Sequence, residues 1–273
     1  MSVRLHVSVM HDRRREEVLP RLLDRLDAAT ATKLKERTGL DGWIIDGGVQ
    51  TLTVADGTMA GPWAALRDGI LMALRTTPNP THVLLIEDYA EPVDGFLPAV
   101  VRAVEAVPGQ ALYFFATKSQ AGAEMDEAAE RGEPFAPVTA RTVGSLAVVL
   151  PIDLAGFFLA DTTDAKWDYD FRRLFPCSPH AGDARLWHWL GQHGWAQWVS
   201  VWSLVEHGCP GYDQSISGAD RPRAMTDADA ADQAARRRAY RLRDWDVEGI
   251  EWGGEGGDQG TKGRRDQGTR SDA

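Results

Sequence analysis

Acidic side chains stand at the point where an apolar segment of the chain ends. The stretch THVLLIEDYAEPVDGF, residues 81–96, begins with an apolar run from Val83 to Ile86 and turns acidic at Glu87 and Asp88. A short continuous apolar run is typical of a strand that is buried on both faces. Two adjacent carboxylates at its end repel each other and lose hydration, so a bound ligand that compensates them is one explanation of their placement. The alternative is an ordinary solvated loop carboxylate or helix cap.

Two further groups lie at comparable places in the sequence. Asp183 opens a helical stretch in HAGDARLWHWLGQHG, and His207 follows a strand in SLVEHGCPGYDQSISG. Carboxylate oxygens suit Mg²⁺ or Mn²⁺, and Mn²⁺ also accepts an imidazole. Asp88 and His207 could therefore converge on one cation. The alternatives are a helix N-cap for Asp183 and a hydrogen-bonded loop histidine for His207.

The elements that must position these residues alternate between strands and helices. The apolar periodicity predicts an α/β fold with a mostly parallel central sheet. Residues 117–142 show no sustained period and are expected to form a long mobile loop. The predicted strands cover residues 3–9, 42–46, 49–54, 83–86, 111–116, 144–151 and 196–202, and the predicted helices cover residues 16–26, 61–74, 96–107, 152–160 and 181–193.

In such sheets ligands bind at the carboxyl ends of the strands, which is where Asp12, Asp46, Glu87 and Asp88 fall.

The composition divides the chain into three parts. Residues 1–218 are expected to form one Rossmann-like domain, and residues 219–252 a C-terminal helical extension. Residues 253–273 are Gly-rich and charged and should be a disordered tail.

Length and charge limit the classes of function. The chain has 273 residues and a formal net charge of -10, which disfavours sequence-independent binding along nucleic acid. Five arginines between residues 236 and 243 could form a local basic surface, although a solvated helix face is the simpler interpretation. Two cysteines are too few for a disulfide framework, so we expect reduced thiols and a cytoplasmic protein. No apolar run is long enough to cross a bilayer.

Four stretches, taken in order over residues 3–218, resemble the GT-A-fold glycosyltransferases that use nucleotide sugars. LHVSVMHDRRREEVLPRLLDRL is similar to the first strand and helix, where the base docks, and WIIDGG to the acidic turn that contacts uridine or ribose. GPWAALRDGILMALRTTPNPTHVLLIEDYAEPVDGFL resembles the helix that leads into the acidic D-x-D strand. SLVEHGCPGYDQSISG resembles the segment whose histidine completes the metal site.

The resemblance implies an enzyme that moves a hexosyl or pentosyl group from a nucleoside-diphosphate sugar to an acceptor hydroxyl. The acceptor would be a glycan, a small molecule or a hydroxymethylated phage DNA base, the last of these in a host cytoplasm. Asp183 is implied as the base that deprotonates the acceptor, and Asp88 and His207 as ligands of Mn²⁺ or Mg²⁺. The residues implied to contact the nucleotide sugar are His11, Asp46, Trp63, Arg67 and Glu87.

The sequence also departs from this family pattern. Tyr89 stands where the last residue of the acidic triplet is usual, and Ser203 where a proline is usual. A phenol is a poor ligand for Mg²⁺ or Mn²⁺, so either Asp88 and Glu87 bind the metal or metal dependence is weakened. The alternative function is a catalytically inactive protein that binds a nucleotide sugar or a glycan. A nucleotidyltransferase fits less well, because VMHDRRREE lacks a Gly-rich nucleotide signature.

Overall fold

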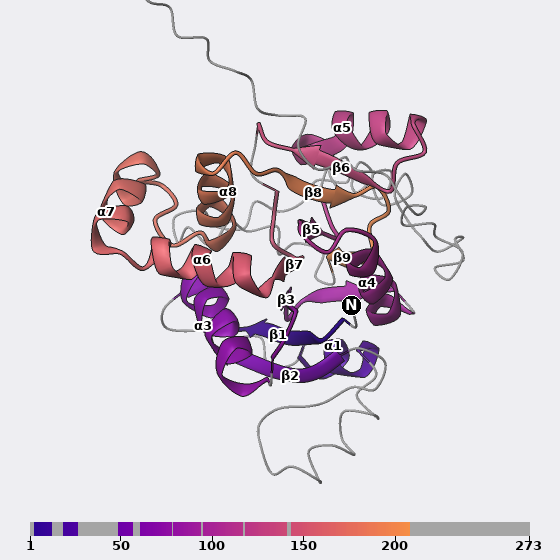
Figure 1. The fold of residues 1–273 in the computed structure, drawn as a ribbon, viewed down its shortest axis with the longest axis horizontal. Coiled ribbons are helices and arrows are strands. Elements are labelled where there is room, and N and C mark those ends of the chain that lie inside the picture. The colour runs from indigo at the N-terminus through magenta and orange to yellow at the C-terminus, as the bar shows by residue number, and fades with distance from the viewer. Residues whose placement is uncertain are drawn as a thin grey trace, which may run out of the picture.

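The computed structural model describes residues 3–12, 19–26, 49–56, 61–77, 79–93, 95–116, 118–140 and 143–207. The predicted strand at residues 42–46 with Asp46, the C-terminal helix and the tail lie outside these ranges. The described residues form a central sheet with helices on both faces (Figure 1).

Seven strands form the central sheet, in the order β2-β1-β3-β7-β5-β8-β6. Strands β2, β1, β3, β5 and β8 run in one direction, while β7 and β6 run in the other. The predicted α/β class with a mostly parallel sheet is therefore confirmed. The strands are β1 (Leu5–His11), β2 (Val49–Asp56), β3 (His82–Glu87), β5 (Ala111–Tyr113), β6 (Phe135–Val138), β7 (Ala147–Pro151) and β8 (Gln197–Ser200).

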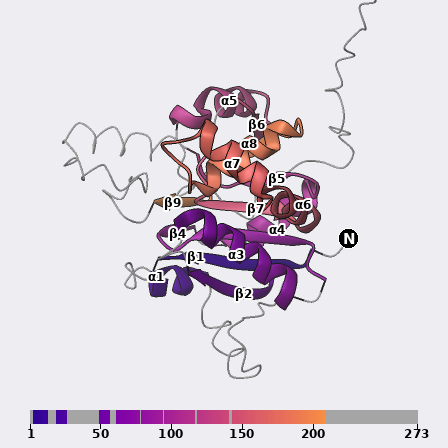
Figure 2. The same ribbon diagram turned by 90° about the vertical axis from the view of Figure 1, so that its left-hand side faces the viewer.

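The sheet separates two hydrophobic cores, because side chains alternate between its faces along each strand. In β3, Leu84 and Ile86 join the core under α1 and α4, whereas Val83 and Leu85 join the core under α3, α5, α6 and α8. Figure 2 looks onto the side of the molecule that carries α3, α6, α7 and α8. The helices are α1 (Leu19–Arg25), α3 (Gly61–Thr76), α4 (Phe96–Ala106), α5 (Lys118–Glu130), α6 (Ile152–Thr162), α7 (Ala165–Leu174) and α8 (Gly182–Gln192).

A second, two-stranded sheet follows the acidic end of β3. Strand β4 (Ala90–Pro92) pairs antiparallel with β9 (Val205–His207). The β9 segment is tied to the main sheet as well, since Leu204 N–H donates to Phe114 O at 3.0 Å. Pro92 ends β4, in keeping with a residue that cannot donate to a strand ladder. The small sheet thus lies across the end of β3 and the end of β5.

The expected loop at residues 117–142 is wrong, because this segment contains α5 and β6. The buried side of α5 is made of Ala121, Met125 and Ala128, which are at most 1% exposed and follow helical spacing. Alanine is only weakly apolar, so the helical period of these buried residues does not stand out in the sequence. Helix α7, which carries Trp167 and Phe171, was also not predicted. None of the helices in the described part of the chain is long and apolar enough to cross a membrane.

Helix α3 lies very close to the sheet at Gly69. A Cβ atom at this position would come within 2.7 Å of Ser8 Oγ and 2.9 Å of Leu85 Cδ2. Contacts this short force the neighbouring side chains or the helix to move. The absence of a side chain at Gly69 therefore sets the distance between α3 and strands β1 and β3.

We predict that Gly69→Ala lowers the melting temperature by several degrees, because overpacking costs about 1–3 kcal/mol and outweighs the better helix propensity of alanine. The matched control is Gly156→Ala in α6, where an added Cβ meets no atom within 4 Å. That variant should be as stable as the wild type or more stable. Thermal unfolding measures both, and equal melting temperatures for the two variants would contradict the close packing of α3.

Candidate functional site

A buried carboxylate connects the ends of the first and third strands. Asp88 follows β3, and its Oδ2 lies 2.8 Å from Nδ1 of His11 at the end of β1. The same oxygen accepts a hydrogen bond from the backbone N–H of Asp12 at 2.9 Å. The backbone N–H of Asp88 in turn donates to Met10 O at 3.0 Å, which extends the β1–β3 ladder. These bonds fix Asp88 and His11 relative to each other.

The two side chains of this pair differ in how far they can be reached from outside. The side chain of Asp88 is 0% exposed and that of His11 is 8% exposed. A carboxylate removed from water in this way has to be compensated by hydrogen bonds. His11 and the Asp12 N–H provide them, and His11 is the member of the pair that keeps contact with solvent.

The small β4–β9 sheet brings His207 to the same place in the fold. The register pairs His207 with Ala90, two residues beyond Asp88. The backbone of His207, which comes late in the domain sequence, thus lies beside the acidic stretch, residues 87–89. The side chain of His207 lies outside the described part of the chain.

The other two residues of the acidic stretch are partly buried. The N–H of Glu87 donates to Leu146 O at 2.9 Å, which holds the end of β3 against the segment before β7. Tyr89 packs against the core under α1 and α4. Tyr89, which stands in the usual place of an acid, is thus partly a packing residue.

The described side chains do not complete a divalent-cation site by themselves, since the side chain of His207 is not among them. Among them, no group of three or more His, Cys, Asp or Glu side chains is arranged to hold a metal ion. The Oδ2 atom of Asp88 is already bonded to His11 and Asp12. The expectation that Asp88 and His207 bind Mn²⁺ or Mg²⁺ stays a prediction.

Asp183 lies in the first turn of α8, but it is not the helix cap. The N-cap position is Ala181, which has no side-chain cap bond, so Asp183 accepts a backbone N–H of the first turn from a position inside the helix. Its Oδ1 accepts the N–H of Ala184 at 2.8 Å. Burial raises the pKa of Asp183 above that of an ordinary aspartate. A carboxylate with a raised pKa is a better proton acceptor.

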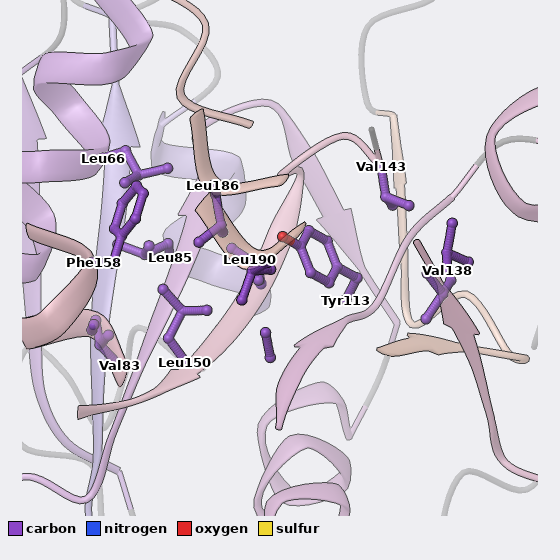
Figure 3. Close-up of a cluster of buried hydrophobic side chains, with 14 of the residues drawn as sticks. Leu66, Val83, Leu85, Tyr113, Val138, Val143, Leu150, Phe158, Leu186 and Leu190 are labelled. Carbon is purple, nitrogen blue, oxygen red and sulfur yellow. The ribbon is translucent and has the colours of Figure 1, made fainter. Parts of the chain in front are cut away.

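Tyr113 is a neighbour of Asp183 that no pattern in the sequence singles out. It ends β5, is 0% exposed and belongs to a buried cluster with Leu186 and Leu190 of α8 (Figure 3). Its hydroxyl has no hydrogen-bond partner among the described residues. Burial and the negative charge of Asp183 both raise the pKa of Tyr113. The phenol therefore stays neutral beside the Asp183 carboxylate.

Asp183 lies at the same edge of the sheet as His11 and Asp88. Helix α3 connects two parallel strands, β2 and β3, so it begins near their carboxyl ends. The start of α8 packs on the start of α3, because the N–H of Trp63 donates to His180 O at 3.0 Å. The carboxyl ends of the strands thus gather the residues that the sequence singled out separately.

Trp63 and Arg67 are placed on α3 with protein partners. Trp63 is 8% exposed and packs edge-on against Phe158, with ring centroids 5.6 Å apart. Arg67 Nε donates to Asp68 Oδ1 at 2.9 Å, so its guanidinium group is paired with the next residue of the helix. The prediction that Trp63 and Arg67 contact a nucleotide sugar is not tested by these contacts.

Arg185 holds α8 against α7 and is another residue that no pattern in the sequence singles out. Its side chain is 0% exposed, and its Nη2 atom lies 2.6 Å from Asp168 Oδ1. The guanidinium carbon lies 4.9 Å from the ring centroid of Trp63 and 4.5 Å from that of Phe171. These contacts fix the first turn of α8, and with it Asp183, relative to the start of α3.

Comparisons with known proteins identify no family for this chain. No family model matches it, and no curated protein sequence matches it. A solved structure of mouse xyloside xylosyltransferase 1 in its apo form is similar over 71% of this chain and 82% of that chain, with a TM-score of 0.38 and 8% sequence identity. A likeness at this level does not establish common function.

We predict that Asp183→Asn raises the melting temperature at neutral pH. A carboxyl group whose pKa is raised by folding loses stabilising free energy as the pH rises through its folded-state pKa, and asparagine avoids this loss. The difference between variant and wild type should vanish at about pH 3, where the carboxyl group is protonated in both states. Thermal unfolding across pH measures this. The difference in melting temperature, variant minus wild type, should be larger at pH 7 than at pH 3. A smaller difference at pH 7 would contradict the buried charge.

Proposed function

We propose that this protein is a glycosyltransferase that transfers a sugar from a nucleoside-diphosphate sugar to an acceptor hydroxyl. The observation that carries the proposal is that two groups lie at the same carboxyl edge of the sheet. One is the His11–Asp88 pair, and the other is Asp183, whose pKa is raised by burial. In α/β sheets this edge is where ligands bind, and a carboxylate with a raised pKa is suited to take a proton.

The proposed reaction needs one proton acceptor near the acceptor hydroxyl. The hydroxyl oxygen attacks the anomeric carbon, the bond from that carbon to the diphosphate oxygen breaks, and the proton passes to the Asp183 carboxylate. The nucleoside diphosphate leaves with the electron pair. Ala184 N–H keeps the Asp183 carboxylate oriented through Oδ1. Buried Arg185 and Trp63 keep the helix that carries it in place.

The donor is proposed to lie along the ends of β1 and β3, against His11, with Glu87, Trp63 and Arg67 as further candidates. The acceptor is a glycan, a small molecule or a hydroxymethylated DNA base. A divalent cation, if bound by Asp88 and His207, would supply charge stabilisation for the departing diphosphate.

A second function, binding of a nucleotide sugar without transfer, is favoured by the acidic stretch itself. The Asp88 side chain is 0% exposed, and Tyr89 packs against the core in the usual place of an acid. Both features reduce the number of carboxylates available for a metal-assisted reaction. Turnover separates this function from the first.

The direct test is a mass-spectrometric screen of purified protein with several nucleotide sugars and pools of acceptors, including DNA that contains hydroxymethylated bases. Formation of a glycosylated product and of the nucleoside diphosphate supports transfer. Binding without any transfer or hydrolysis across the panel supports the second function. Neither binding nor turnover with any donor would refute both.

We predict that Asp183→Asn lowers the transfer rate by about 10²–10⁴-fold, which is the usual contribution of general-base assistance. Asparagine can still accept the Ala184 N–H, so donor affinity should remain near wild type. The matched control is Asp153→Asn, since Asp153 is the second residue of α6 as Asp183 is of α8. The control should transfer at the wild-type rate. A near wild-type rate for Asp183→Asn would show that another group accepts the proton.

We predict that exhaustive treatment with EDTA abolishes transfer and that added Mn²⁺ or Mg²⁺ restores it, because the departing diphosphate builds up negative charge that must be stabilised. Donor binding should be measured in the same samples by calorimetry. Unchanged transfer after EDTA treatment would remove the metal from the proposal and leave the protein side chains to stabilise the leaving group.

A further inference from the structure

The hydrogen bonds of Asp88 determine which nitrogen of His11 carries a proton. The Oδ2 atom of Asp88 accepts the backbone N–H of Asp12 at 2.9 Å, so this oxygen is an acceptor. Nδ1 of His11 lies 2.8 Å from the same oxygen. An acceptor oxygen at this distance requires a donor, and the donor is the Nδ1–H group. In a neutral imidazole ring the other nitrogen, Nε2, then holds a lone pair.

The burial of the pair decides which of its members a ligand meets. The Asp88 side chain is 0% exposed, while the His11 side chain is 8% exposed. The two ring nitrogens are on different sides of the imidazole, so a ring that directs Nδ1 at Asp88 directs Nε2 away from it. Asp88 can therefore act on a ligand through His11.

We propose that Asp88 is a positioning residue that holds His11 in the Nδ1–H tautomer, so that Nε2 accepts a hydrogen bond from a hydroxyl group of the bound nucleotide sugar. The ligand part of this inference rests on the function proposed above. The tautomer part rests on the two hydrogen bonds to Asp88 alone.

The chemistry of Nε2 selects a hydroxyl over a phosphate. A lone pair attracts an O–H or N–H donor and repels a phosphate oxygen, which is itself an acceptor. A nucleotide sugar offers hydroxyl groups both on its ribose and on its sugar. His11 thus contributes to recognition of the donor and not to stabilisation of the departing diphosphate.

The tautomer is tested by two-bond ¹H–¹⁵N correlation spectra of the histidine rings in the ligand-free protein at about pH 7.5, above the ordinary histidine pKa. His11→Asn assigns the signal by its disappearance. We expect a ring that is protonated at Nδ1 and not at Nε2. A His11 ring protonated at Nε2, alone or together with Nδ1, overturns the inference whatever the protein binds.

Two variants of Asp88 test the cause of the tautomer. Asp88→Asn can place its amide oxygen where Oδ2 lies, so the Nδ1–H tautomer should persist. Asp88→Ala removes the acceptor, and the Nε2–H form should then become populated. An unchanged tautomer in folded Asp88→Ala would show that another group sets it and would overturn the role of Asp88. If Asp88→Ala does not fold, the wild-type spectrum and the His11 variants still decide.

Two variants of His11 test the ligand part by calorimetric titration with UDP-glucose, UDP-xylose, GDP-mannose and ADP-glucose. Asparagine places an N–H group near the position of Nδ1 but has nothing at Nε2, whereas glutamine reaches the position of Nε2. We expect His11→Asn to weaken binding by about 3- to 10-fold, the value of one hydrogen bond, and His11→Gln to stay closer to wild type. Equal affinities for wild type and His11→Asn overturn the ligand part.

The same titration with UDP or GDP alone identifies the hydroxyl. A loss in His11→Asn that also appears with the free nucleotide assigns the contact to the ribose, and a loss seen only with the nucleotide sugar assigns it to the sugar. If none of the four nucleotide sugars binds to the wild type, the proposed function fails and takes the ligand part with it. The tautomer part is still decided by the spectra.

Discussion

A carboxylate without solvent exposure at the end of a strand is the constraint on which the candidate site depends. Removing the charge of Asp88 from water is costly unless hydrogen bonds compensate it. The compensation comes from Nδ1 of His11 and the backbone N–H of Asp12, both at the end of β1. Because those partners lie on the neighbouring parallel strand, the bonds require β1 and β3 to end together. They also orient the one ring of this pair that keeps contact with solvent.

The packing of two helices brings the second chemical group to the same edge. Gly69 allows α3 to lie directly on β1 and β3, and the start of α8 packs on the start of α3. Arg185, enclosed by Trp63 and Phe171, holds α8 in that position. Asp183 thereby comes close to the buried phenol of Tyr113, in surroundings that raise the pKa of its carboxyl group. In the proposed function, Asp183 accepts the proton of the acceptor hydroxyl and the His11–Asp88 pair recognises the donor.

The sequence predicted the parts of this arrangement that follow from local pattern. Apolar runs identified β3, α3 and α8, since a buried strand and an amphipathic helix are encoded within a few residues. Helix α5 was not predicted because two residues of its buried side are Ala121 and Ala128. Alanine is also common on helix surfaces and does not mark a buried face. The partner of Asp88 could not be predicted, because His11 is 77 positions away and nothing in either stretch specifies the other. The same holds for the β4–β9 pairing and for Tyr113 beside Asp183.

Hydrogen–deuterium exchange in the presence of a panel of nucleoside-diphosphate sugars tests the central claim most directly, because it locates the ligand without assuming any activity. The account predicts that a bound nucleotide sugar slows exchange in three separate stretches that meet at one edge of the sheet: residues 5–12, 84–93 and 180–188. Protection that is confined to other surfaces of the protein, or no protection with any nucleotide sugar, would contradict a nucleotide-sugar site at the ends of β1 and β3.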